Sequence, residues 1–285
     1  MDSGQTFRWH SLDANEQTWI GVISGNIVKL TARNATIYGE NEFRGNDYLE
    51  SYLSASDDIE TIFSQIPQDA VLSRARNSLR GLRLLSQDPW ECLISFVCSI
   101  NCNIPSIRIK IENLCRHFGK RIYSDLDVVA YTFPTPESIA VASKEELLAC
   151  RLGFRWRYVK FIAGQVASGN LDLTRLSTLP YEIAHIELMS STSGKTQGVG
   201  PKVADCALLY SYHRTEAFPI DVWILRCISR YYINELQFPN HLSLKSYTRI
   251  SEYMRNKFGR YAGYAQLYLY VAMRTSVITQ CTTQA

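Results

Sequence analysis

Hydrophobic and polar positions follow two different periods along the chain. From Phe7 to about Glu40, the stretch TWIGVISGNIVKLTARNATIYG alternates β-branched and polar residues around a Ser24-Gly25-Asn26 turn signal. A period of two around such a turn predicts antiparallel strands joined by a tight hairpin. From about Asp57 onward, apolar residues recur at spacings of three and four, which predicts helices.

Capping residues and glycines divide the helical part into segments. Ser143 with Glu146 forms a capping-box pattern, and Pro136 follows Thr135 at an expected first turn. The glycines where helices should stop are Gly119, Gly169 and Gly259. The predicted helices run over residues 89–101, 104–118, 143–151, 155–168, 181–191, 202–212, 221–233, 244–258 and 261–276. The fold class is therefore mainly α (α+β), with an antiparallel β-sheet domain over residues 1–56 and an α-helical part over residues 57–285.

Composition narrows the class of protein without naming a function. Of the 285 residues, 46% are hydrophobic and 20% charged, as in ordinary folded soluble proteins. No signal peptide or membrane-length apolar run is seen, so an intracellular protein is expected, in the cytoplasm (nucleoid) or in the nucleus of a eukaryote. The eight cysteines form no C-x-x-C pair and the five histidines are dispersed, which favours reduced thiols and predicts no catalytic metal. A net charge of +3 neither requires nor excludes nucleic-acid binding.

The segment Gly198-Val199-Gly200-Pro201-Lys202 combines a tight turn with a helix start. Glycine allows the turn, proline suits the first helical position, and the first N–H groups of the helix can bind phosphate. With the helical pattern before it, the segment predicts a helix-hairpin-helix at about residues 181–213, a module that grips DNA backbone. A plain turn between two packed helices is the alternative.

Lys202 and Asp221 are the candidate catalytic pair. A lysine in the first turn of a helix is opposed by the helix dipole, and that field together with desolvation favours a neutral, nucleophilic amine. Asp221 follows Pro219-Ile220 at an expected helix start, where it can cap the helix and hold a charge near the nucleophile. Many aspartates at this position are caps and nothing more, so Asp221 alone would not indicate catalysis.

Several motifs together resemble one family. The sequences G-V-G-P-K-V-A-D-C and P-I-D-V are similar to the 8-oxoguanine branch of the helix-hairpin-helix, Gly/Pro-rich, catalytic-aspartate superfamily of DNA glycosylases. Four further segments of the chain resemble motifs of the same branch. They are G-Q-T-F-R-W at residues 4–9, D-P-W-E-C-L-I-S-F-V-C-S-I-N-C-N at 88–103, L-G-F-R-W-R-Y-V at 152–159 and Y-A-G-Y-A-Q at 261–266. The resemblance covers residues 2–276 in the order of the family.

The resemblance implies a base-excision DNA repair enzyme that is both N-glycosylase and abasic-site lyase. Lys202 would attack the anomeric carbon of the deoxyribose, expel 8-oxoguanine and leave a Schiff base, after which β-elimination cuts the strand. Asp221 would stabilise the positive charge that develops on the sugar. The damaged nucleotide has to be flipped out of the duplex to reach these groups.

The same resemblance implies a pocket for the flipped base. Cys206 would lie on one face of the base and Tyr270 on the other, Gln266 would bond its Watson–Crick edge, and the Gly4 carbonyl would accept the N7 hydrogen that distinguishes oxidised guanine. Without the resemblance, Cys206 and Tyr270 are better explained as core residues at helical spacing.

Other residues are implied to contact the DNA. Phe154 would stack between bases as a wedge, Asn101 would fill the space left by the flipped base, and Arg155 would contact the orphaned base or a nearby phosphate. Gly198 and Gly200 would let the hairpin backbone approach the strand. Phe154 could also simply cover the core.

The chain departs from the family pattern at several positions. Ser106 stands where relatives carry an arginine that reads the cytosine opposite the lesion, so a weaker preference for cytosine is expected. Trp223 replaces a frequent histidine, and Thr196-Gln197 replaces an apolar-proline pair before the hairpin glycines. The chain also opens directly on the G-Q-T-F-R-W motif, which suggests a truncated sheet domain or a start further upstream.

Other functions are compatible with parts of this pattern. A glycosylase for alkylated bases or for adenine mismatches is disfavoured by Lys202, and a non-catalytic DNA-binding relative would leave Asp221 unexplained. The expected partner is double-stranded DNA containing oxidised guanine, bound by a monomer without contact to a membrane. No cofactor is expected apart from a structural monovalent cation at the hairpin, which the resemblance implies.

Overall fold

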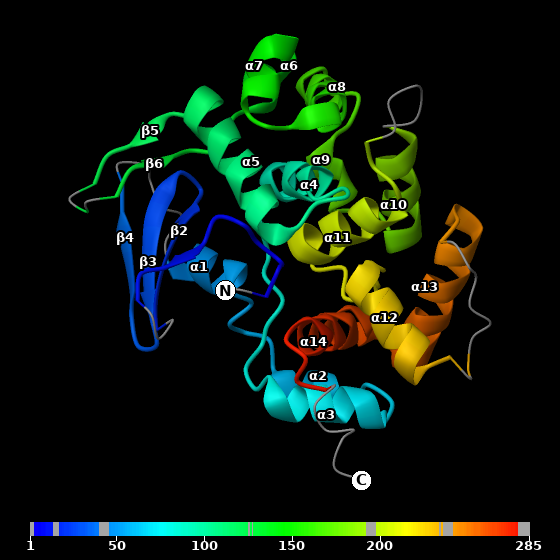
Figure 1. The fold of residues 1–285 in the computed structure, drawn as a ribbon. Helices are drawn as coiled ribbons and strands as arrows, with labels where there is room; N and C mark the ends of the chain where they lie inside the picture. Colours follow the sequence, from blue (N-terminus) through cyan, green and yellow to red (C-terminus); the bar gives the residue numbers. More distant parts are fainter. Residues whose placement is uncertain are drawn as a thin grey trace. The chain divides into compact units, whose positions relative to one another are not determined.

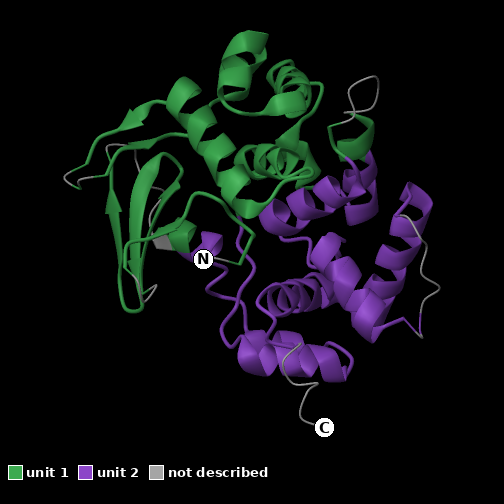
Figure 2. Cartoon of the chain, in the orientation of Figure 1, with its two compact units in different colours: residues 1–49, 87–178, 187–199 green, residues 50–86, 179–186, 200–285 purple. Residues whose placement is uncertain are grey.

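The computed structural model describes residues 3–13, 17–39, 46–124, 126, 128–191, 198–233, 235 and 242–278 (Figure 1). These residues fold into two compact units, each assembled from separate stretches of the chain (Figure 2). Unit 1 consists of residues 1–49, 87–178 and 187–199, and unit 2 of residues 50–86, 179–186 and 200–285. The sequence boundary proposed after residue 56 stays a prediction.

The N-terminal sheet of unit 1 is antiparallel, as the alternating pattern predicted. Its strands follow each other in chain order, and Ser24 and Gly25 form the two-residue turn between the second and the third. Their φ angles of 47° and 76° are those of a hairpin turn that needs positive φ at both positions. The strands are His10–Ser11 (β1), Thr18–Ile23 (β2), Asn26–Thr31 (β3) and Ala35–Tyr38 (β4).

A second, smaller hairpin covers part of this sheet. It consists of Arg121–Ile122 (β5) and Ala130–Tyr131 (β6), which the sequence did not predict. Ile122 packs with Ile20 and Ile27 of the sheet in one apolar cluster. Strands of two residues have too little periodic pattern to be recognised, so only the packing reveals this hairpin.

Four helices of unit 1 begin at capping residues, of which the sequence indicated Thr135 and Ser143. Asp88, Asn103, Thr135 and Ser143 each accept a backbone N–H at a helix start, and the capping box of Ser143 with Glu146 is complete. These caps satisfy donors that the first helical turn leaves without partners. The elements are Pro89–Cys98 (α4), Ile104–Phe118 (α5), Pro136–Val141 (α6), Lys144–Ala149 (α7), Gly153–Arg155 (η1, a 3₁₀ turn), Trp156–Ala167 (α8) and Leu173–Leu176 (α9).

The core of unit 2 is built around one buried helix, Ala262–Arg274 (α14). Its residues 262–269 are all buried, and it packs against helices α3, α12 and α13 (Figure 1). The other elements of this unit are Ile59–Ser64 (α2), Ala70–Ser78 (α3), Pro201–Tyr212 (α11), Val222–Tyr231 (α12), Leu244–Phe258 (α13) and Gly259–Tyr261 (η2).

Two helices include residues of both units. Tyr181–Ser190 (α10) agrees with the predicted helical segment, whereas Asn46–Tyr52 (α1) lies in the stretch that was assigned to the sheet domain. The sequence analysis did not predict α1, because a helix of seven residues carries too few turns for its period to stand out beside the strands.

Candidate active site

Both helices of the predicted helix-hairpin-helix are present in the structure. Helices α10 and α11 follow each other, and the His185 Nε2 atom lies 3.3 Å from the Pro201 carbonyl oxygen at the start of α11. The far end of α11 terminates at His213, whose φ of 55° is left-handed. Residues 192–197, which include Thr196-Gln197, lie outside the described residues.

Gly198 and Gly200 lie in different surroundings, and only Gly198 leaves no room for a side chain. A Cβ atom at Gly198 would lie 2.8 Å from the Tyr158 Cβ atom and 3.0 Å from the Ile162 Cδ1 atom, so helix α8 leaves no room for a side chain. At Gly200 a Cβ atom would have nothing within 4 Å. Gly200 is the N-cap of α11 and provides no side-chain cap, and its exposed position leaves space for a ligand to approach the helix start.

Asp221 caps helix α12 as predicted. Its Oδ1 atom accepts the backbone N–H groups of Trp223 and Ile224, both at 2.9 Å. Burial of the carboxyl raises its pKa, against the opposing effects of these hydrogen bonds and of the Lys202 charge. The helix start therefore holds the carboxylate at a fixed place where Lys202 acts on it electrostatically.

Lys202 and Cys206 lie one turn apart on α11 and interact directly. A side-chain hydrogen bond joins Lys202 to Cys206, and Cys206 is only 3% exposed. Burial raises the pKa of the Cys206 thiol to about 12, although the Lys202 charge lowers it. At neutral pH the sulfur is therefore a thiol. Lys202, Cys206 and Asp221 form one electrostatically coupled group.

Gln266 and Tyr270 lie on α14 in the same unit. The Gln266 Nε2 atom donates to the Pro219 carbonyl at 3.0 Å, and its Oε1 atom accepts the Tyr210 hydroxyl at 3.4 Å. Gln266 thus supports the segment that leads to Asp221. Tyr270 is half-buried one turn further along, with the Arg274 guanidinium 5.9 Å from its ring centroid. Their contacts with a flipped base stay predictions.

Gly4 lies in unit 1, in a loop that is well held. Its φ of 78° is left-handed, which glycine adopts easily. The next residue, Gln5, is 1% exposed, and its carbonyl accepts the Gln87 side chain at 2.8 Å. The loop conformation that the G-Q-T-F-R-W motif requires is therefore fixed within the unit.

Asn101, Phe154 and Arg155 come together in unit 1. Arg155 is 7% exposed and donates to the carbonyl oxygens of Ile100 (2.7 Å from Nε) and Asn101 (3.0 Å). Its guanidinium also stacks over the Phe154 ring, at 4.4 Å from the centroid. Asn101 is exposed with a φ of 49°, and Phe154 is 49% exposed. Arg155 therefore positions the two exposed residues, and its own contact with DNA stays a prediction.

Ser106 sits in the first turn of α5, beside a lysine. Its carbonyl accepts the Lys110 Nζ atom at 3.1 Å, and the same Nζ atom lies 3.2 Å from the Cys102 sulfur. Lys110 is only 8% exposed. The position that lacks the expected arginine thus has a cation nearby, with its side chain bonded inside the unit.

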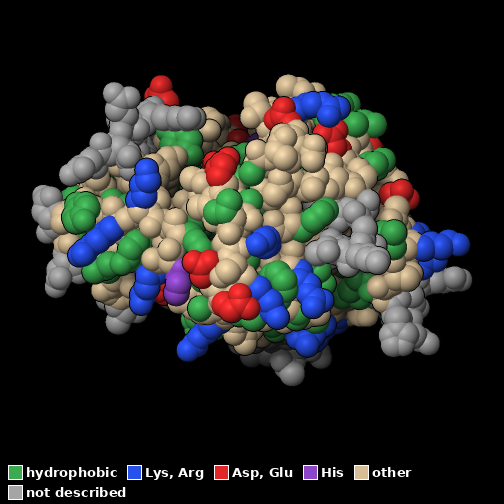
Figure 3. Space-filling model, turned by 90° about the horizontal axis from the view of Figure 1, so that it is seen from above, with side chains coloured by type: hydrophobic (Ala, Val, Ile, Leu, Met, Phe, Trp, Pro, Cys, Tyr) green, Lys and Arg blue, Asp and Glu red, His purple; other side chains and the backbone are tan. Residues whose placement is uncertain are grey.

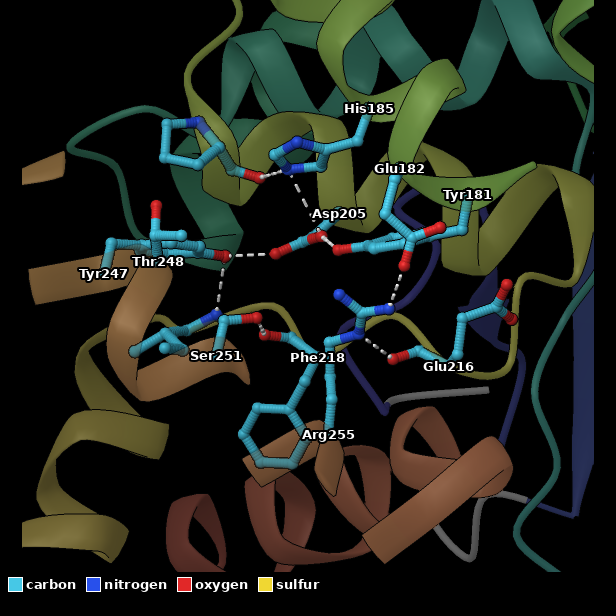
Figure 4. Close-up of polar contacts among 12 residues, drawn as sticks. Tyr181, Glu182, His185, Asp205, Glu216, Phe218, Tyr247, Thr248, Ser251 and Arg255 are labelled. Carbon is cyan, nitrogen blue, oxygen red and sulfur yellow. Dashed lines mark hydrogen bonds and ion pairs between the residues drawn. The ribbon is translucent and has the colours of Figure 1, made fainter. Parts of the chain in front are cut away.

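A buried polar cluster in unit 2 was missed by the sequence analysis. Asp205 is fully buried and accepts the hydroxyl groups of Tyr181 and Tyr247, each at 2.5 Å (Figure 4). The His185 Nε2 atom lies 3.4 Å from the same carboxylate. Burial raises the pKa of Asp205, while His185 and the two hydroxyl groups lower it. The only signal in the sequence was a carboxylate inside the apolar run V-A-D-C-A-L-L.

Further properties of the described residues bear on the class of site. No group of three or more His, Cys, Asp or Glu side chains among them could hold a metal ion, and their seven cysteines form no disulfide. Within the same residues, no helix has the length and apolar character needed to cross a membrane. On the face seen in Figure 3, lysine and arginine side chains are interleaved with acidic ones.

Comparisons with known proteins agree with these features. Residues 1–93 match the family described as 8-oxoguanine DNA glycosylase, N-terminal domain, and residues 94–250 match the HhH-GPD superfamily base excision DNA repair proteins. The chain is 34% identical to a "Probable N-glycosylase/DNA lyase" of Methanothermobacter thermautotrophicus over 77% of this chain and 72% of that protein. It is 30% identical to the N-glycosylase/DNA lyase OGG1 of Arabidopsis thaliana over 95% of this chain and 75% of the relative.

A solved structure shows the same similarity in three dimensions. The 8-oxoguanine glycosylase/lyase of Clostridium acetobutylicum, in complex with double-stranded DNA containing cytosine opposite 8-oxoguanine, has a TM-score of 0.84 and 31% identity. The alignment covers 97% of this chain and 90% of that one. The family resemblance stated from the motifs is confirmed, and the chain belongs to the HhH-GPD superfamily of base excision DNA repair proteins, in its 8-oxoguanine DNA glycosylase branch.

Proposed function

We propose that this protein excises 8-oxoguanine from double-stranded DNA and then cleaves the strand at the abasic site. The observation that carries the proposal is that Lys202 and Asp221 lie at the starts of helices α11 and α12, where the Lys202 charge acts on the Asp221 carboxyl. The relatives that the chain matches are named N-glycosylase/DNA lyase, which is the bifunctional activity that a lysine nucleophile provides.

Lys202 acts as the nucleophile. Its amine nitrogen forms a bond to the anomeric carbon of the flipped nucleotide while the bond from that carbon to the base breaks. The base leaves with the electron pair and takes up a proton that the amine gives up. Ring opening of the sugar then gives a Schiff base with Lys202. In the β-elimination step, the sugar carbon C2′ loses a proton, and the bond between C3′ and its phosphate oxygen breaks.

Asp221 stabilises the charge of the reacting sugar. A carboxylate that is already ordered by two backbone N–H groups needs no reorganisation when positive charge develops beside it. Its partial desolvation strengthens this interaction, because fewer water dipoles screen the charges. The same carboxylate favours the position of the Lys202 amine near the sugar.

The base pocket combines one thiol, one amide and one aromatic ring of unit 2. Cys206 and Tyr270 would face the two sides of the base, and Gln266 would exchange its bond to the Pro219 carbonyl or to Tyr210 for the Watson–Crick edge of the base. The Gly4 carbonyl is the proposed acceptor for the N7 hydrogen. Normal guanine would present its N7 lone pair to that carbonyl. Two acceptors would then face each other without a hydrogen between them, which disfavours binding of normal guanine.

The proposed DNA partner is bound through the hairpin and through two exposed side chains. Gly200 leaves the start of α11 open to phosphate, and Phe154 and Asn101 are exposed for insertion into the duplex. We propose that the protein acts as a monomer on DNA. The chemistry needs no metal ion or organic cofactor, and a monovalent cation at the hairpin carbonyls would have a structural role only.

The first test is excision from duplexes that carry one 8-oxoguanine opposite each of the four bases, with and without borohydride. We expect base release by the native protein and a covalent adduct that disappears in Lys202→Gln. Binding of the lesion without base release would instead favour a non-catalytic DNA-binding relative. Base release without any borohydride adduct would favour a monofunctional glycosylase.

The same series tests the role of Ser106. A serine lacks the planar fork with which arginine pairs two acceptors of one base, so we expect a weaker preference for cytosine opposite the lesion. Ser106→Arg is the matched variant, and it should restore a preference for cytosine. A native rate that falls steeply with every other partner base would contradict this expectation.

A further inference from the structure

The backbone that leads to Asp221 is held by side chains at four successive points. The Arg255 Nε atom donates to the Glu216 carbonyl at 3.1 Å and Ser251 Oγ to the Phe218 carbonyl at 3.4 Å. Gln266 holds the Pro219 carbonyl, and the Tyr247 hydroxyl oxygen accepts the Ile220 N–H at 3.1 Å. We call residues 216–220 the approach segment.

Three of these four side chains come from one face of α13. Tyr247, Ser251 and Arg255 are spaced by four residues, so they stand in a row on the helix surface (Figure 4). Tyr247 and Ser251 are buried, and Arg255 is further fixed by an ion pair of 2.8 Å with Glu182. The row holds the approach segment along its length rather than at one end.

Tyr247 has a second bond, which connects the approach segment to the helix of the nucleophile. Its hydroxyl hydrogen is donated to Asp205 at 2.5 Å, while its oxygen accepts the Ile220 N–H. Asp205 lies on α11, three residues after Lys202, and Ile220 immediately precedes Asp221. One hydroxyl group therefore bridges the two segments that carry the catalytic pair (Figure 4).

The hydrogen bond to Asp205 gives this bridge its direction. The Tyr247 hydroxyl has one hydrogen, which it donates to the Asp205 Oδ2 atom, so the hydroxyl lone pairs are left to face the Ile220 N–H. Asp205 and Tyr247 are almost fully buried. Hydrogen bonds between buried groups are strong, and a broken one is poorly compensated. The orientation of the Tyr247 hydroxyl is thus determined by Asp205.

We propose that Asp205 and Tyr247 are positioning residues that set the separation of Lys202 and Asp221. This inference rests on the proposed function of that pair. Neither residue is expected to touch the DNA or the reacting atoms. Their effect is geometric, because a displacement of about 1 Å between reacting groups can slow a reaction by about 100-fold.

Tyr181 provides a matched control within the same cluster. Its hydroxyl also donates to Asp205 at 2.5 Å, and it is buried to the same degree as Tyr247. Among the hydrogen bonds of the described residues, the Tyr181 hydroxyl has none to the approach segment. Tyr181→Phe and Tyr247→Phe therefore each remove one hydroxyl bond to the Asp205 carboxyl group, and only the second releases Ile220.

The experiment compares these two variants by single-turnover base release at saturating protein, together with affinity for a duplex carrying a stable abasic-site analogue. We expect Tyr247→Phe to slow base release by about 10- to 100-fold and Tyr181→Phe by less than about threefold. Affinity for the abasic duplex should change by less than about threefold in both. Thermal unfolding should show a loss of stability in both variants, larger in Tyr247→Phe, because that variant also leaves the buried Ile220 N–H without its acceptor.

A second variant guards against loss of folding in Tyr247→Phe. Ser251→Ala removes the weaker bond to the Phe218 carbonyl from the same row and should slow base release by about three- to tenfold. Equal rates for the tyrosine variants, or a loss of affinity in place of rate, would overturn the positioning role. Absence of a Lys202-dependent adduct in the native protein would instead overturn the proposed function, and with it this inference.

Discussion

Two helices of unit 2 begin at a capping aspartate, and the pKa values of the two aspartates are shifted in opposite directions. Asp58 caps α2 and Asp221 caps α12, and each accepts two backbone N–H groups at about 3 Å. Hydrogen bonds from Thr61 lower the pKa of Asp58, whereas burial raises the pKa of Asp221. The cap stabilises the charged form in both cases, so the difference comes from the surroundings.

The comparison shows what turns an ordinary cap into a catalytic group. Asp58 is exposed, and water together with the Thr61 hydroxyl solvates its charge. Asp221 is half-buried beside Lys202, and Gln266 and Tyr247 hold the residues just before it. A desolvated carboxylate at a fixed distance from a cation can act on a reacting group, while a solvated one mainly stabilises its own helix.

The largest expected effect separates the two caps by activity. Asparagine caps helices about as well as aspartate, so Asp221→Asn and Asp58→Asn should both keep their helices. We expect base release to fall by about 100- to 1,000-fold in Asp221→Asn, because the developing charge on the sugar loses its counter-charge. Single-turnover excision of 8-oxoguanine measures this, with Asp58→Asn as the control within about twofold. A smaller loss than about tenfold in Asp221→Asn would remove the distinction between the caps.

A smaller effect is expected from giving α11 the cap that α12 already has. Gly200→Asp fits the backbone, since φ is −89° and a Cβ atom meets nothing within 4 Å. The new carboxylate would take up the open N–H groups and repel phosphate, so DNA affinity should fall by about tenfold at low salt. Binding titrations at two salt concentrations measure this.

Thr135→Asp is the matched control for that experiment. It adds the same charge at another helix cap, that of α6. We expect little change in its DNA affinity and no loss of stability in either variant. Equal weakening by both substitutions would mean that net charge, rather than the start of α11, determines affinity.

The smallest expected effect is on stability, and it has opposite signs at the two caps. Because the folded pKa of Asp221 is raised, ionisation destabilises the fold above the unfolded value of about 3.9. Asp221→Asn should therefore raise Tm at pH 7 by about 1 to 3 °C. The difference should shrink as the pH falls from the raised pKa toward about 3.9.

For Asp58 the lowered pKa reverses this dependence. The ionised Asp58 carboxylate stabilises the fold above about pH 3.9, the unfolded pKa. This stabilisation is lost as the pH falls through the lowered folded pKa. Asp58→Asn should thus lower Tm at pH 7, and by less than Asp221→Asn raises it, because solvent screens the exposed charge of Asp58. Thermal scans of both variants between pH 3 and about pH 7 would test the pair, and shifts of the same sign would contradict the comparison.

Much of the fold was predictable because it depends on local patterns. The bounds predicted for α5 and α13 agree with the structure, and so do the Ser24-Gly25 hairpin and the capping box of Ser143. Helix α1 and the β5–β6 hairpin escaped prediction, since each is too short for its period to be recognised. Their existence depends on packing against other parts of the chain.

The sequence by itself determined the mainly helical fold class, the turn at Gly198 and Gly200, and the placement of Lys202 and Asp221 at the starts of two helices. These follow from propensity, capping and motif, which act over a few residues. Only the tertiary structure decided which of several capping aspartates is desolvated, that Arg155 is buried, and that Asp205 and Tyr247 join the two catalytic segments. Such features arise when segments distant in sequence exclude water from one another, and desolvation has no local pattern that a sequence could display.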